Sequence, residues 1–176
     1  MKQQLIALLI LFLFFCANAH ALNDQTLTAT ATQVKIQVVN GCTLNNVSTG
    51  TAAIGTLDFG RIYKLNSIAD ANTSAGNGNI ELHCTPGTTA KITMDAGLYG
   101  SNINNRKMRL NTGTATLNYQ IYTSASRSTV WDDTVGVSIT FSSDINQSIP
   151  IYGRVPIQTT PLSGPYSDQI VVTVSY

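Results

Sequence analysis

Short runs in which apolar and polar residues alternate constrain this chain most, because they recur along most of its 176 residues. This period of two is typical of a strand with one buried face, and no stretch after the N-terminal segment keeps helical periodicity for three turns. Thr, Ser, Asn and Gly dominate between the runs. The pattern predicts an all-β protein. The expected strands cover residues 34–38, 54–59, 80–84, 90–94, 117–121, 135–141, 149–151 and 170–176.

Turn signals separate these runs at the spacing of a β-sandwich. Examples are Asn40-Gly41, Asp95-Ala96-Gly97 and the segment from Pro161 to Pro165. Residues 70–79, DANTSAGNGN, have the composition of a surface loop. No repeat or second domain is evident, so we expect one sandwich domain over residues 40–176, with an N-terminal extension over residues 22–39.

The N-terminal segment has the features of a secretory signal peptide. Lys2 gives it a positive start, residues 5–15 are apolar, and Ala19-His20-Ala21 fits a signal peptidase site. We expect residues 1–21 to be removed by cleavage after Ala21. Cleavage after Ala19 is the alternative, and a retained anchor is less favoured because the apolar run is short for a membrane span.

The charge of the chain argues against one class of function, and its cysteine content indicates a disulfide. The chain has ten Lys and Arg residues and nine Asp and Glu residues. Lys2 is removed with the signal peptide, so the mature chain is formally neutral. A neutral chain is a poor nucleic-acid binder. Cys16 also leaves, and Cys42 and Cys84 remain as a pair for which a disulfide is the default in an oxidising compartment.

No residue set predicts catalysis or metal binding. His83 is the one histidine that remains after cleavage, and its place in the alternation predicts an outward side chain. Asp132 and Asp133 are adjacent, which suits a turn better than acid–base chemistry, and the other aspartates form no calcium-loop pattern. We therefore expect no enzyme, no cofactor, no metal and no small-molecule substrate.

The two ends of the mature chain raise a question about pairing. The last strand, with Ile170, Val172, Val174 and Tyr176 on one face, would leave an open sheet edge, which natural proteins normally cover. Residues 26–39 form a long β-favouring segment whose inward face carries Thr32, Val34, Ile36 and Val38. The simplest interpretation is a first strand of the same domain. The alternative is a donor strand that completes the sheet of a neighbouring molecule.

Several motifs resemble those of the spore coat protein U domain family, which includes the pilins of archaic chaperone-usher pili such as the Csu-type biofilm pili. They run in order through almost the whole mature chain, and they end in an aromatic residue, Tyr176. The matching segments are residues 40–43 (NGCT), 55–60 (GTLDFG), 78–84 (GNIELHC), 106–110 (RKMRL), 117–122 (LNYQIY), 149–153 (IPIYG) and 166–176 (YSDQIVVTVSY).

This resemblance implies an incomplete immunoglobulin-like sandwich that lacks its final strand. A periplasmic chaperone would lend the missing strand, and the N-terminal segment of the next subunit would replace it at the outer-membrane usher. Thr32, Val34, Ile36 and Val38 would be the donor side chains. Ile170, Val172, Val174 and Tyr176 would form the acceptor edge, and Cys42 would bridge to Cys84.

The expected function is therefore that of a structural pilin, exported to the periplasm and then assembled with other pilin subunits into a surface pilus for attachment and biofilm formation. The alternative is a self-contained secreted immunoglobulin-like binding domain or coat protein. A tip adhesin with a second domain is disfavoured by length. The segment of residues 22–33 is longer than a minimal donor extension, and it is richer in Thr and Ala.

Overall fold

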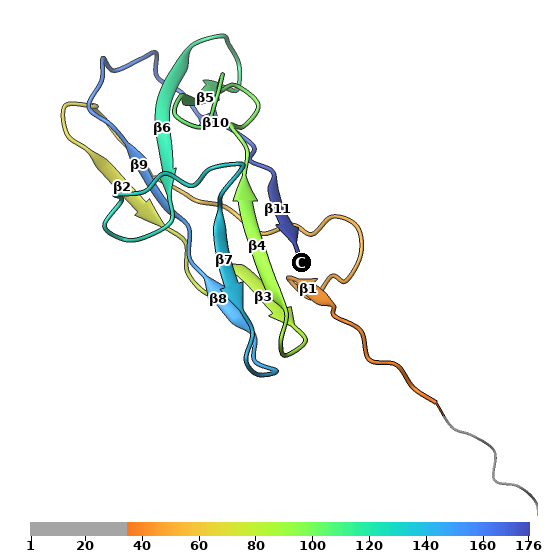
Figure 1. The fold of residues 1–176 in the computed structure, drawn as a ribbon. Coiled ribbons are helices and arrows are strands. Elements are labelled where there is room, and N and C mark those ends of the chain that lie inside the picture. Colours follow the sequence, from red (N-terminus) through yellow and green to blue (C-terminus); the bar gives the residue numbers. More distant parts are fainter. Residues whose placement is uncertain (1–34) are drawn as a thin grey trace, which may run out of the picture. The chain divides into compact units, whose positions relative to one another are not determined.

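A computed structural model describes residues 35–176, and these residues form strands and connecting segments without a helix (Figure 1). The all-β prediction is confirmed for this part of the chain. The strands are β1 (Cys42–Leu44), β2 (Ala69–Asn72), β3 (Ile80–Cys84), β4 (Thr89–Met94), β5 (Arg106–Leu110), β6 (Thr116–Tyr122), β7 (Val137–Thr140), β8 (Gln147–Ile149), β9 (Tyr152–Val155), β10 (Tyr166–Ser167) and β11 (Val172–Ser175).

All strand pairs are antiparallel, and they form three sheets within the compact unit Val38–Tyr176. One sheet has the order β1-β3-β8, the second β10-β5-β6-β9-β2 and the third β11-β4-β7. Figure 1 shows β4 between β7 and β11, with the C-terminus at the end of β11. The last strand therefore has a sheet partner on one side only.

Alternation decides which side chains enter the core. In β3 and β4, Ile80, Leu82 and Ile92 are fully buried, while the neighbouring polar residues face outward. Trp131 is also fully buried, and its indole N–H donates to the Ile92 carbonyl at 3.0 Å, so the ring is oriented as well as packed. Buried residues from all three sheets belong to one core, the arrangement of a β-sandwich.

Cys42 and Cys84 lie directly opposite each other in the register of β1 and β3 and form a disulfide with an S–S distance of 2.04 Å. Both cysteines are buried. The bond fixes the start of β1 to the end of β3, and it thereby anchors the chain just after the N-terminal extension.

The structure corrects several expected strands. Residues 54–59 form no strand, because no sheet pairs with them and because Gly55 within the run and Gly60 just after it adopt φ values of 126° and 71°, outside the range of a β-strand. The last strand is shorter than expected and covers Val172–Ser175. Part of the expected loop 70–79 is ordered structure, since Asp70 lies in β2 and Thr73 and Asn79 are buried and hydrogen-bonded to each other.

Candidate functional site

A groove opens along one side of the sandwich core. Its volume is ≈ 1230 Å³, and two chain segments border it, residues 50–63 and residues 160–172. Core side chains from β4, β6 and β9 form part of its walls, and most of these side chains are buried. The lining from the body of the domain comprises Leu44, Leu65, Gly78, Met94, Met108, Leu117, Tyr119, Ile121, Ile151 and Val155. The groove therefore gives access to the apolar interior, which a complete sandwich would close.

The last strand presents an open edge at this groove. The amide of Asp95 donates to the carbonyl of Val171 at 3.2 Å, so the odd-numbered residues of β11 direct their backbone groups toward β4. In an antiparallel ladder the intervening residues then direct their N–H and C=O groups the other way. Those of Val172 and Val174 are consequently available to a further strand.

The opposite border, residues 50–63, has no strand but still packs on the core. Ile54, Leu57 and Phe59 are partly buried against it. The Phe59 ring meets the Tyr119 ring edge-on, with ring centroids 6.5 Å apart. This segment supplies apolar side chains to the groove while its backbone stays outside every sheet.

A polar link connects the groove to the start of the last strand. The Tyr119 hydroxyl donates to Asp168 Oδ2 at 2.6 Å, and Asp168 Oδ1 accepts the amide of Leu98 at 2.9 Å. Burial, followed by the hydrogen bond to Asp168, raises the pKa of Tyr119, so its hydroxyl stays a hydrogen-bond donor at neutral pH. Asp168 is thus held from two sides, close to the point where β11 begins.

Close packing against Gly153 of β9 fixes the border segment. An alanine methyl group at this position would lie 2.6 Å from both Leu57 Cδ2 and Phe59 Cζ. We expect Gly153→Ala to push these side chains outward and to lower the free energy of unfolding by about 1–3 kcal/mol in urea denaturation. Gly41→Ala is the control, because no atom lies within 4 Å of its added methyl group. Equal stability of the two variants would contradict this packing.

The predicted acceptor residues lie at different places relative to the groove. Ile170 and Val172 line it, whereas Val174 packs partly buried against the core and Tyr176 is 60% exposed. The border at residues 50–63 was not predicted to be a part of the site. The GTLDFG segment was its one visible signal.

The predicted donor residues are only partly described. Thr32 and Val34 lie outside the described residues. Ile36 and Val38 are 90% and 81% exposed, and residues 35–41 form no strand. Their role as donor side chains stays a prediction.

In residues 35–176, no group of three or more His, Cys, Asp or Glu side chains could hold a metal ion. His83 faces outward as predicted and pairs with Asp144, with side chains that are 44% and 76% exposed. In the same range, no helix is long and apolar enough to cross a membrane.

Comparisons with known proteins show to which family the chain belongs. The model of the Spore Coat Protein U domain matches residues 28–173. Protein U of Myxococcus xanthus is 32% identical over 158 residues, which cover 85% of this chain and 86% of that protein. A solved complex of a chaperone and a tip adhesion subunit from the archaic chaperone-usher Csu pili of Acinetobacter baumannii aligns with a TM-score of 0.48 and 20% identity. That alignment covers 79% of this chain and 40% of the chain in the complex. With most of its length matched by the family model, the chain belongs to the spore coat protein U domain family.

Proposed function

We propose that this protein is a structural subunit of a chaperone-usher pilus, and that it polymerises by donor-strand exchange. The observation that carries the proposal is the groove of ≈ 1230 Å³ beside the open edge of β11. A strand inserted there would receive backbone hydrogen bonds from Val172 and Val174 and would cover the apolar walls. The spore coat family is one of structural proteins, and no catalytic step is part of the proposal.

The N-terminal extension supplies a suitable strand. Ile36 and Val38 are exposed and alternate with polar residues, and the compact unit begins only at Val38. Burying Val34, Ile36 and Val38 in the groove of a neighbour would contribute about 1.5–3 kcal/mol each. Each subunit would both donate and accept a strand, and such head-to-tail contacts generate a filament.

An open groove also requires protection before assembly, because exposed core side chains and unpaired backbone groups favour aggregation. In the proposed pathway a periplasmic chaperone fills the groove first, and the donor strand of the next subunit replaces it at the outer-membrane usher. The product is a surface pilus that serves attachment and biofilm formation.

The second candidate is a secreted coat protein or a self-contained immunoglobulin-like binding domain. Membership of the spore coat protein U domain family favours the coat role. A coat subunit could use the same groove, but its assemblies would form a layer rather than fibres.

The test compares the oxidised mature chain with a variant that lacks residues 22–39, by size-exclusion chromatography and negative-stain microscopy. We expect the full chain to form linear polymers that resist SDS. The truncated subunit should form no polymers and should bind a synthetic peptide of residues 26–39. A stable monomeric full chain, unfolded by truncation, would show that the extension belongs to its own domain. Layers in place of fibres would favour the coat role.

A further inference from the structure

A second cavity, of ≈ 360 Å³, lies on the other face of the five-stranded sheet. In β6, Leu117, Tyr119 and Ile121 line the groove. The alternate residues Asn118, Gln120 and Tyr122 line the second cavity, together with Tyr119, which borders both hollows, and Arg154 of β9, which lies opposite Gln120 in the register. The cavity volume falls in the range of roughly 300–1,000 Å³ that is typical of small-molecule sites.

The walls of this cavity carry hydrogen-bonding groups that other residues do not use. Within residues 35–176, neither the side-chain amides of Asn104 and Asn118 nor the hydroxyl of Tyr122 has a hydrogen-bond partner; Asn118 pairs with Gln158 through its backbone only. These groups offer both donors and acceptors, the combination that sugar hydroxyls require.

The groups behind the walls are fixed. The Gln120 amide donates to the Ile103 carbonyl at 2.9 Å and accepts from the Arg106 guanidinium at 2.7 Å. Arg154 forms two hydrogen bonds with Asp70, of 2.7 and 2.8 Å, which leave its Nη1 without a partner in the described residues. The cavity is therefore organised before any ligand arrives.

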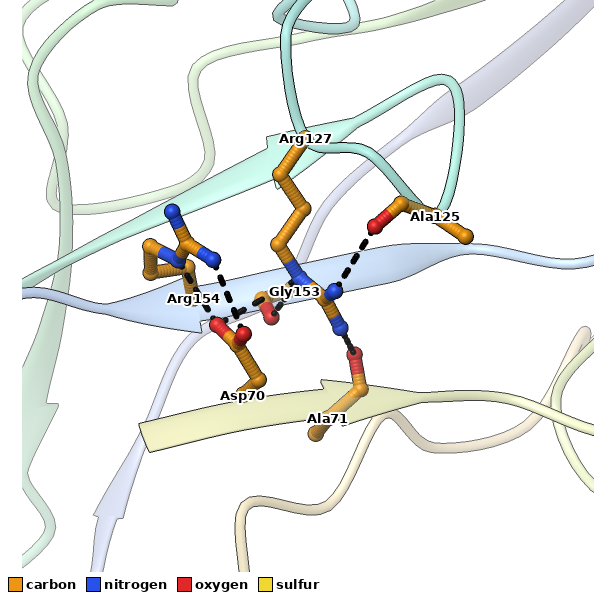
Figure 2. Close-up of polar contacts among 6 residues, drawn as sticks. All are labelled: Asp70, Ala71, Ala125, Arg127, Gly153 and Arg154. Atoms are coloured by element: carbon orange, nitrogen blue, oxygen red, sulfur yellow. Dashed lines mark hydrogen bonds and ion pairs between the residues drawn. The ribbon is translucent and has the colours of Figure 1, made fainter. Parts of the chain in front are cut away.

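Figure 2 shows Asp70 between Arg154 and a second arginine, Arg127. Arg127 Nε forms an ion pair with the same carboxylate oxygen at 3.4 Å, and its hydrogen bonds go to the backbone carbonyls of Ala71, Ala125 and Gly153. One carboxylate thus pairs with two guanidinium groups. This side of the cavity therefore keeps a net positive charge.

A buried cation lies behind the wall of the cavity. Arg106 lines the cavity and is 0% exposed. Its hydrogen bonds go to the Gln120 amide and to the carbonyls of Met94, Asp95 and Trp131, and no carboxylate in residues 35–176 lies within ion-pair distance. Asp95, Asp133 and Asp168 act on this charge at longer range, and the guanidinium supports the cavity wall by holding the Gln120 amide.

We infer that this cavity binds an acidic sugar residue, a hexuronate of a cell-surface or extracellular polysaccharide. The sugar carboxylate accepts hydrogen bonds from Arg154 Nη1, and the ring hydroxyls pair with Asn104, Asn118 and Tyr122. The site lies on the sheet face away from the groove, so the inference goes beyond subunit assembly and does not depend on it.

The experiment titrates the oxidised mature chain with trigalacturonic acid and, separately, with neutral galactotriose, by isothermal titration calorimetry and saturation-transfer NMR. Charge-assisted hydrogen bonds are about twice as strong as neutral ones, so we expect the acidic trisaccharide to bind at least roughly tenfold more tightly. Absence of binding by the acidic sugar, or equal binding of both sugars, would overturn the inference.

Two substitutions locate the site. Asn118→Asp places a negative charge in the cavity, and Tyr122→Phe removes one hydroxyl; each should weaken binding by roughly tenfold. Asn66→Asp, at an exposed position outside the cavity, is the matched charge control and should leave binding unchanged. Thermal unfolding verifies that each variant is folded. Binding that survives both cavity substitutions, or that falls equally with Asn66→Asp, would show that the cavity is not the site.

Discussion

Ile36→Asp is expected to abolish polymer formation while the subunit still folds and binds its chaperone. Ile36 is 90% exposed and lies outside every strand, so the substitution removes no contact within the domain. In the groove of a neighbour, however, a carboxylate would be buried against apolar walls without a partner. The loss of the isoleucine costs about 1.5–3 kcal/mol, and the unpaired charge adds several kcal/mol to that. The measurement is the yield of SDS-resistant polymer from the purified mature chain.

Gln37→Asp is the matched control for this prediction. It adds the same charge one position along, on the opposite face of the donor strand, where the side chain would point to solvent. We expect it to polymerise normally. Normal polymer from Ile36→Asp would rule out this register, and failure of both variants would indicate that charge alone, rather than burial at position 36, disturbs assembly.

Some strands were predictable because one face of each is clearly apolar and the other clearly polar. In β3, β4 and β6, apolar residues alternate with polar ones over five or more positions, and the expected spans agree closely with the observed ones. The inward side chains of these strands also supply most of the core.

Other strands carry no such pattern. β2 has the sequence ADAN, without a large apolar residue, and it forms because it pairs with β9. β5 reads RKMRL, and its first residue, Arg106, is fully buried with four hydrogen-bond acceptors. A buried arginine satisfied by backbone carbonyls from distant segments cannot be recognised from periodicity, which assigns charged residues to the surface.

The candidate site was only half visible in the sequence. The last strand was expected to have an open edge because its alternation runs to the C-terminus. The other border, residues 50–63, was expected to contain an ordinary strand, but three glycines in it, Gly50, Gly55 and Gly60, have positive φ and it pairs with no sheet. The link from Tyr119 to Asp168 joins residues 49 positions apart, and such a contact depends on the tertiary fold alone.

Replacing both cysteines by serine should lower the free energy of unfolding of the mature chain by about 4 kcal/mol, the chain-entropy value for a loop of this length. Cys42 and Cys84 are 42 positions apart in sequence and close a large loop of the unfolded chain. β1 has only three residues, so few other contacts hold the chain at the point where the extension leaves the domain. Urea denaturation of the variant and of oxidised wild type gives the difference.

Wild type treated with reductant is the control for the double substitution, because it opens the same loop without changing the side-chain volume. Both samples should lose similar stability. In versions that lack residues 22–39, the peptide of residues 26–39 should raise the urea midpoint of each folded subunit. The reason is that a ligand that binds only the native state stabilises it by mass action. A loss below about 1 kcal/mol would mean that the β1–β3 pairing persists without the bond. In that case the groove, rather than the disulfide, would limit the stability of the isolated subunit, and filling the groove would become the decisive step in its folding.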